Sequence, residues 1–328
     1  IFLFKTMADL RKRRRLSAHH GAVLGVVWNK AGTYCVTHGK DGVVRLWNPH
    51  RGAGEGGVAS ASTAVQQSDQ ALLIRAYDAG FHAQGVHGVC ISGDSARFAS
   101  CGEEKAAWEW DVVAGVTTRK FWGHDSRINA VEYNLDATVL FTASDDRTVR
   151  AWDLRVKGGP PIQVLGGFGD SVTSMFVNAH QVVAGSVDGT VRTYDLRAGV
   201  VRSDALGVPV TCVSASNDGA CVLVSCLDSA VRLLESASGA ILNTYCGGGH
   251  VAKGMKLGSC LSRDDGLVYS GSESDGIVRV WDLVGAGGRP SHTLAGHTMP
   301  VVAVACHPIR NDMLLTASVD GDALLWEK

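Results

Sequence analysis

The chain has 328 residues, of which 45% are hydrophobic and 19% charged, and its formal net charge is −1. Such a balance offers no general electrostatic attraction for nucleic acid, and no apolar run approaches the ~20 residues that a membrane-spanning helix needs. The nine cysteines show no metal-ligand spacing, so we interpret them as small buried side chains in a reducing compartment.

The N-terminal segment contains a run of five basic side chains, residues 11–15. We predict a disordered basic tail over residues 1–13, with Met7 as the natural start of the protein. A run of this kind is a solvated tail more often than it is a nuclear import signal, and both interpretations stay open here.

The clearest pattern lies in residues 123–154, which open with Gly-His and close with Trp-Asp-Leu. Three short segments of alternating polarity, residues 128–133, 139–143 and 148–152, are bounded by Asn, Asp and Gly, which predicts three strands and their turns. The closing position recurs roughly every 40–47 residues after one longer first interval. An acidic residue lies six positions before each member of the series, which is Trp47, Trp110, Trp152, Tyr194, Leu234, Trp281 and Trp326.

Seven copies of this unit predict an all-β, seven-bladed propeller of the WD-repeat kind over residues 14–328. The last unit ends at Trp326 after three strands. Its fourth strand is therefore expected from residues 14–18, which would pair with the last blade and close the ring.

Some units depart from the pattern. The long first interval places an insertion at residues 53–71 of blade 1, rich in Gly, Ala and Ser and almost uncharged, which we expect to be disordered. The fourth strand of that blade is expected at residues 72–77. Blade 2 has Glu104 at the acidic position, and blade 6 begins with a longer loop.

Four positions recur in the intact blades: a His, a Ser two residues before the acidic position, the Asp itself and the closing Trp. In the WD-repeat family these side chains form a buried chain of hydrogen bonds, and the resemblance implies the same chain here. The residues concerned are His124, Ser144, Asp146 and Trp152 in blade 3, and His297, Ser318, Asp320 and Trp326 in blade 7.

The degenerate blades support this interpretation. Blade 4 has Phe168 and Tyr194 at the His and Trp positions, and blade 5 has Leu206 and Leu234. Losing one partner leaves a buried polar group unpaired at a cost of about 1–3 kcal/mol, whereas losing both is nearly neutral. Blades 1 and 2 have glycine at the Ser position, Gly39 and Gly102, so water or a direct contact between His and the acidic residue is expected there.

Ser144, His124 and Asp146 are also the residue types of a hydrolase triad. The same set recurs in blade 7, which favours a structural role, and the sequence contains no Gly-x-Ser-x-Gly elbow, phosphate-binding loop or metal cluster. We therefore predict no enzymatic activity, no cofactor, no metal and no small-molecule substrate.

A more specific resemblance rests on four segments: WNPHRG at 47–52, AGSVDGTVRTYDLR at 184–197, VSCLDSAVRLLE at 224–235 and ACHP at 305–308. Together they resemble the mitogen-activated protein kinase organizer family over about residues 19–326. That family implies a scaffold for a kinase cascade, association with the catalytic spliceosome, and a location in nucleus and cytoplasm. The insertion, the basic tail and Glu104 are departures.

A competing interpretation rests on the sequences WDLR and YDLR, which resemble the box that cullin-ligase substrate receptors present to their adaptor. Arg155 and Arg197 would carry that contact. Because Arg follows Trp-Asp in many propeller blades, a purely structural role is favoured.

Protein partners are expected at one end of the ring, where the turns between the second and third strands meet the loops that enter the blades. The side chains there carry both signs of charge, which suits a protein or peptide more than nucleic acid. The candidates are Lys40, Glu103, Lys105, Asp125, Arg127, Asp145, Arg147, Thr298 and Met299.

Overall fold

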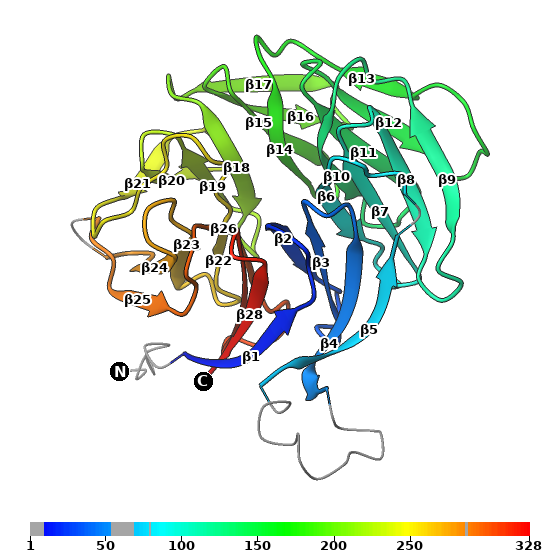
Figure 1. Ribbon diagram of the computed structural model, residues 1–328. Coiled ribbons are helices and arrows are strands. Elements are labelled where there is room, and N and C mark those ends of the chain that lie inside the picture. Colours follow the sequence, from blue (N-terminus) through cyan, green and yellow to red (C-terminus); the bar gives the residue numbers. More distant parts are fainter. Residues whose placement is uncertain (1–9, 54–68, 79, 286–287) are drawn as a thin grey trace.

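The computed structural model describes residues 10–53, 69–78, 80–285 and 288–328 as seven four-stranded antiparallel sheets arranged in a ring (Figure 1). This confirms the predicted all-β, seven-bladed propeller. Over these residues the structure contains strands and no helix, so no helix is available that could cross a membrane. Most of the predicted tail and insertion, residues 1–9 and 54–68, lies outside the described residues.

Each blade uses its strands in chain order from the ring centre outward, except that the last blade takes its outer strand from the N-terminus. The strands are β2 (Val23–Trp28), β3 (Cys35–Gly39), β4 (Val44–Gly52) and β5 (Ala71–Tyr77) in blade 1; β6 (Val86–Ile91), β7 (Arg97–Gly102), β8 (Ala106–Asp111) and β9 (Thr117–Trp122) in blade 2; β10 (Ile128–Tyr133), β11 (Val139–Ser144), β12 (Val149–Asp153) and β13 (Gln163–Leu165) in blade 3; β14 (Val172–Val177), β15 (Gln181–Ser186), β16 (Thr190–Asp195) and β17 (Val200–Ala205) in blade 4; β18 (Val210–Ala215), β19 (Cys221–Cys226), β20 (Val231–Glu235) and β21 (Ile241–Tyr245) in blade 5; β22 (Ser259–Leu261), β23 (Leu267–Ser270), β24 (Ile277–Asp282) and β25 (His292–Ala295) in blade 6; and β26 (Val301–Cys306), β27 (Met313–Ser318), β28 (Asp322–Glu327) and β1 (Arg11–Ser17) in blade 7.

The second strand of a blade is the most deeply buried. In β11 every residue after Val139 is buried, because neighbouring blades cover both faces of the sheet, and such strands are apolar almost without interruption. The innermost strand alternates instead. In β10, Val131 and Tyr133 are buried, whereas Ala130 and Glu132 are only partly covered.

The first and last strands of the described chain, β1 and β28, meet in blade 7 (Figure 1). Strand β1 pairs antiparallel with β28, from Arg11 opposite Glu327 to Ser17 opposite Asp322, so the predicted ring closure is observed. The strand starts earlier than expected: residues 11–13, which we assigned to a disordered tail, belong to β1. Ion pairs at its edge help to explain why, since Glu327 and Asp322 offer carboxylates to the basic run.

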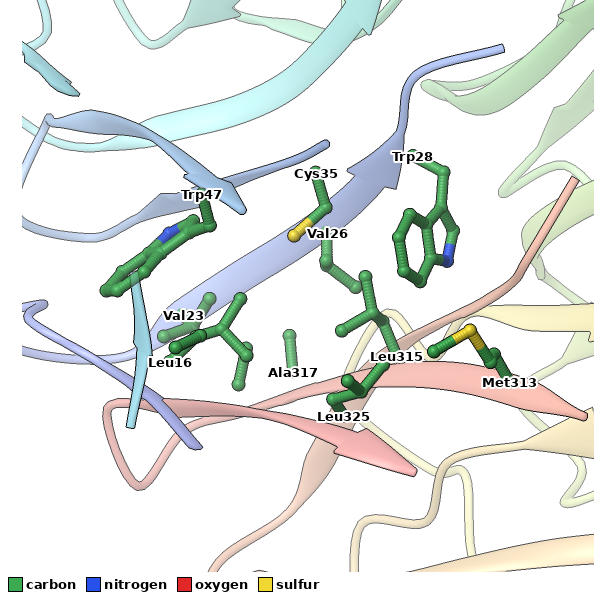
Figure 2. Packing of buried hydrophobic residues seen from close by; sticks show 12 residues of the cluster. Leu16, Val23, Val26, Trp28, Cys35, Trp47, Met313, Leu315, Ala317 and Leu325 are labelled. Atoms are coloured by element: carbon green, nitrogen blue, oxygen red, sulfur yellow. The ribbon is translucent and has the colours of Figure 1, made fainter. Parts of the chain in front are cut away.

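Apolar packing secures this closure. Leu16 of β1 is fully buried in a cluster that joins blade 7 to blade 1 and includes Trp47, Trp28 and Met313 (Figure 2). Burying one large aliphatic side chain contributes about 1.5–3 kcal/mol. The N-terminal strand is therefore held by its core residue as well as by its hydrogen bonds.

Outer strands also bind the next blade through side chains. At one position, opposite the residue before the closing Trp or Tyr, an arginine donates to a backbone carbonyl in the following blade. Such an arginine joins neighbouring blades at four of the seven boundaries between blades, which we call seams. The contacts are Arg14 Nη2 to His50 O (3.4 Å), Arg75 Nη1 to Val113 O (2.6 Å), Arg119 Nη1 to Val156 O (3.3 Å) and Arg202 Nη1 to Ser236 O (2.7 Å).

Because successive strands are antiparallel, the connections alternate between the two ends of the ring. We call the end that carries the turns between second and third strands and the blade-entry loops the entry face. The end that carries the turns between first and second strands and between third and fourth strands is the opposite face.

Candidate functional site

Beneath the entry face of blade 3, one histidine links the loop that enters the blade to its middle strands. His124 Nδ1 donates to Asp146 Oδ2 (2.7 Å), and His124 Nε2 lies 2.7 Å from Thr142 Oγ1. Trp152 Nε1 donates to the same hydroxyl oxygen (2.9 Å). Asp146 Oδ2 also accepts from the backbone N–H of Asp125 (3.2 Å), which fixes the entry loop to the turn.

The chemistry of the donors assigns the protons. An indole N–H only donates, so the Thr142 oxygen accepts from Trp152. The carboxylate of Asp146 only accepts, so His124 carries a proton on Nδ1. Every polar atom of this buried chain therefore has a partner.

The hydroxyl in this chain is not the one predicted. We expected Ser144, but the bridging group is Thr142, two residues earlier. Ser144 Oγ instead donates to Arg127 O (2.7 Å) and accepts from the N–H of Asp146 (3.1 Å). The side chains of a strand alternate between its faces, so residues 142 and 144 share the same face, and spacing alone does not distinguish them.

Blade 7 repeats both features. His297 contacts Asp320 (2.9 Å) and Thr316 Oγ1 (2.8 Å), to which Trp326 also donates (2.9 Å). Ser318 donates to Met299 O. The predicted role of Ser318 in the chain is therefore wrong in the same way as that of Ser144.

In blades 1 and 2 we expected water, or direct contact between His and the acidic residue, to replace a missing hydroxyl. The direct contacts are present, from His19 to Asp41 (2.9 Å) and from His82 to Glu104 (3.1 Å), but no hydroxyl is missing. In blade 1, Thr37 Oγ1 bridges His19 (2.8 Å) and Trp47 (2.9 Å). In blade 2, Ser100 Oγ takes this place between His82 and Trp110 at 2.9 and 2.8 Å. Blades 1 and 2, which have glycine two residues before the acidic position, thus keep a complete chain of hydrogen bonds.

Blades 4 and 5 lose all three members together. Phe168, Ala184 and Tyr194 of blade 4 are buried in one apolar cluster, and the Tyr194 hydroxyl donates outside it to Gly166 O (2.7 Å). In blade 5 the corresponding side chains are Leu206, Val224 and Leu234, again in one cluster. Because the His, hydroxyl and Trp positions are replaced together, none of these three positions strands a polar group of the former chain.

Blade 6 is a third variant. His250 contacts Ser270 Oγ (3.3 Å), but its Nδ1 faces the carbonyl of Ser229 (3.0 Å) and not an acidic side chain. Trp281 donates to Gly288 O (2.8 Å). The acidic residue of this blade, Asp275, pairs with an arginine of β24.

Charge states follow from these contacts. Burial acts to raise the pKa of Asp41, the acidic residue of blade 1, but hydrogen bonds from His19 and Arg45 outweigh it and lower the pKa to about 2. The pKa of Asp146 is lowered for the same reasons by His124 and Thr148. Burial lowers the pKa of the His19 imidazole. At neutral pH Asp41 and Asp146 are therefore charged, and His19 is neutral.

Above these chains lies the predicted partner surface. Three of the candidates are joined by ion pairs: Arg127 Nε lies 2.6 Å from Asp145 Oδ2, and Arg127 Nη1 lies 3.5 Å from Glu103 Oε1. The other candidates occupy separate turns and loops of blades 7, 1, 2 and 3. All of them are exposed, namely Lys40, Lys105, Asp125, Arg147, Thr298 and Met299.

Sequence analysis did not identify Lys256, the side chain that reaches across the ring. Lys256, in the long entry loop of blade 6, donates through Nζ to Thr173 O (2.7 Å) and Asn129 O (3.3 Å) on the other side of the ring. Glu273 Oε2 accepts from the N–H groups of Lys253 and Gly254 and so fixes this loop. The extra length of the blade 6 repeat was the only signal of it.

Arg155 and Arg197, the alternative ligase-adaptor residues, lie at the opposite face. The Arg155 side chain is 72% exposed and forms a bidentate pair with Asp153. Arg197 reaches His180 at 3.5 Å. Each arginine therefore has a partner in its own blade. Over the described residues, no group of three or more His, Cys, Asp or Glu side chains is placed to hold a metal ion.

The chain matches the family model "WD domain, G-beta repeat" at residues 10–48, 115–153, 159–195, 244–282 and 288–327. These matches cover blades 1, 3, 4, 6 and 7. The two unmatched blades are 2 and 5, in which Glu104 and Leu234 replace the usual Asp and Trp.

Several curated proteins are similar over almost the whole chain. "WD repeat domain-containing protein 83" of Rattus norvegicus is 38% identical over 97% of this chain and 92% of its own length. The Homo sapiens protein of that name is 39% identical with the same coverage. The Dictyostelium discoideum homolog is 30% identical over 98% of this chain and 99% of its own. None of these names denotes an enzyme.

Proposed function

The chain belongs to the WD-repeat family and, within it, to the group of proteins named WD repeat domain-containing protein 83, and from this membership we propose that it is a non-catalytic scaffold that binds other proteins. The observation that carries the proposal is the position of two sets of side chains. The His, Asp and Trp side chains lie beneath the entry face and support it, while the residues above them are mostly charged and mostly exposed.

The residues that resemble a hydrolase triad do not offer a nucleophile. His124 uses both nitrogens within its chain, and Ser144 Oγ donates to a backbone carbonyl of the same blade. A nucleophilic serine needs a base within hydrogen-bond reach. These contacts support a structural role for all three residues.

For the partners, we propose components of a mitogen-activated protein kinase cascade, because the sequence resembles the kinase organizer family. Association with the spliceosome, implied by the same resemblance, is the second candidate. A nuclear import signal in the basic run would favour the spliceosome. The fold weakens that argument, because residues 11–15 form the closing strand and Arg14 is buried. We propose residence in both nucleus and cytoplasm on the resemblance alone.

The experiment is affinity capture from nuclear and cytosolic extracts followed by mass spectrometry, with the wild-type chain and a variant that combines Lys105→Glu and Arg147→Glu. Both side chains are exposed at turns of the entry face. Arg127 is left intact because its ion pairs would confound the result. Lys157→Glu, an exposed lysine of the opposite face, is the matched control.

We expect the double variant to lose its kinase-cascade or splicing proteins while its unfolding midpoint stays unchanged, and Lys157→Glu to retain them. Equal capture by both variants would contradict the entry face as the binding surface. Capture of the cullin adaptor, abolished by Arg155→Ala with Arg197→Ala, would support the ligase alternative.

A further inference from the structure

The exposed apolar side chains are distributed unevenly between the two faces. Among the described residues, every large exposed apolar side chain except Phe81, Trp122 and Met299 lies in a turn of the opposite face or in the first four residues of the strand that follows one. The exposed apolar side chains therefore gather at the opposite face and on the outer strands beside it, among charged side chains such as Arg155 and Lys157. A contiguous exposed apolar patch larger than a few hundred Å² marks an interaction site, whereas scattered exposed apolar side chains do not.

A hollow of this surface lies at the seam between blades 1 and 2, and we call it the seam groove. Its volume is about 550 Å³, within the range of ligand sites, and apolar side chains dominate its lining. Those that the argument uses are Tyr34, Leu46 and Ile74 of blade 1 and Ile91, Phe98 and Val113 of blade 2.

The groove has fixed walls. Arg75 Nη1 donates to Val113 O (2.6 Å), and the Tyr77 hydroxyl donates to Val112 O (2.8 Å). Asn29 Nδ2 donates to Ser95 Oγ (3.2 Å) and ties the two blades together a second time. Because these hydrogen bonds join blades 1 and 2 on their own, the groove is already formed without a partner.

A second hollow of about 250 Å³ adjoins the first, since Ile91 lines both. It lies among the first turns of blades 1–3 and includes Leu135, which is 59% exposed. Glu132 of β10 also lines this hollow. The two hollows therefore combine an apolar groove with one acidic side chain.

Glu132 is an unusual acid for this protein. No hydrogen bond or ion pair joins its carboxylate to another described residue. Although the side chain is only partly covered, the protein packed around it removes enough water to raise its pKa to about 7. The groups that face it are the Cys90 thiol, itself uncharged because burial raises its pKa, and Lys30, which lines the same hollow without an ion pair to Glu132. Burial deprives the Glu132 carboxylate of water, and a cation beside it would again stabilise its charged form.

We propose that the seam groove and the adjoining hollow bind an extended segment of a partner protein in which large apolar side chains are followed by a lysine or arginine. The apolar side chains fill the groove between Ile74 and Val113, and the cation pairs with Glu132. This surface is separate from the entry face, so a scaffold could hold two proteins at once, and either surface can fail its test without the other.

The test begins with a library of random twelve-residue peptides displayed on phage and selected on the full chain. Enriched peptides are synthesised with a fluorescent label, and their affinity is measured by polarisation. We expect apolar residues followed by Lys or Arg. Val113→Asp, which charges the groove rim at a side chain that is 84% exposed, should abolish binding. Val284→Asp, at a 91% exposed site of another blade, should leave it unchanged.

A double-mutant cycle tests the cation. Replacing the peptide's basic residue by norleucine should weaken binding to the wild-type chain about tenfold, but should have little effect on the Glu132→Gln variant. The proposal is overturned if enriched peptides lack the pattern, if Val113→Asp binds them normally, or if the two changes are additive. Self-association of the chain that Val113→Asp abolishes would also overturn it, because the occupant would then be a second copy.

Discussion

The choice between Thr142 and Ser144 provides the sharpest test of the hydrogen-bond chain. Thr142 is fully buried, and its hydroxyl serves both His124 and Trp152. Thr142→Val keeps the shape but leaves one imidazole nitrogen and one indole donor unpaired. At about 1–3 kcal/mol for each, we expect the free energy of unfolding to fall by about 2–6 kcal/mol. Ser144→Ala removes a bond to Arg127 O and a bond from the N–H of Asp146. Because Arg127 O keeps the N–H of Asp145 as a donor, the change should cost less, about 1–2 kcal/mol.

The assay is equilibrium unfolding in urea followed by tryptophan fluorescence, with the exposed Thr298→Val as control. A third variant tests the logic directly. Combining His124→Phe, Thr142→Ala and Trp152→Tyr gives blade 3 the side chains of blade 4, and it should lose less stability than the sum of the three single changes. If Ser144→Ala cost more than Thr142→Val, or if the triple variant were additive, the account of the chain would be refuted.

Four further outcomes are expected. His124→Ala should lower the free energy of unfolding by about 1–3 kcal/mol, and an unchanged midpoint in urea would refute this. Leu16→Ala should cost about 2–5 kcal/mol and speed proteolysis at the N-terminus, whereas resistance equal to wild type would show that β1 does not depend on its core residue. Arg75→Met should lower the melting temperature measurably, since it opens one seam, while an unchanged melting curve would make the clamp incidental. On acidification, stability should begin to fall below about pH 6.5, the unfolded pKa of histidine, because His19 has a lowered pKa in the fold and the unfolded chain binds more protons. It should fall further below about pH 4, where Asp41 and Asp146, whose pKa values are also lowered, become protonated on unfolding; stability that rises toward pH 4 would contradict the assignment.

The fold could be predicted because it is repeated. A single blade such as residues 123–154 is a weak signal, but the recurrence of Trp and an acidic residue six positions earlier sets the register of all seven. The missing fourth strand of blade 7 then required the N-terminus to supply it. What the pattern could not give was the exact start of β1, since pairing of Arg13 and Arg15 with carboxylates of β28 depends on the closed ring.

The identity of the bridging hydroxyl could not be read from spacing, because Thr142 and Ser144 are both polar, both buried and on the same face of β11. A comparison across blades would have helped. Wherever the closing Trp donates to a hydroxyl, the residue ten positions before it is Thr or Ser, namely Thr37, Ser100, Thr142 and Thr316. Where the chain of hydrogen bonds is lost, Ala184 and Val224 occupy that position. The serine two residues later does not follow this rule.

Contacts across the ring were beyond prediction for another reason. Lys256 and Thr173 are far apart in sequence and belong to blades that are not neighbours in the ring, so no repeat pattern relates them. The seam groove likewise depends on how two neighbouring sheets splay. Such features arise from the arrangement of the blades, whereas the register of each blade is encoded locally.

The most direct test of the central claim, a closed ring that binds proteins through its faces, is hydrogen exchange measured by mass spectrometry on the chain alone and in a complex captured from extract. We predict slow exchange throughout β11, β15 and β19 in both states, with new protection in the complex confined to entry-face turns, the seam groove or both. Protection found only at the outer strands, or loss of protection in the middle strands on binding, would contradict it.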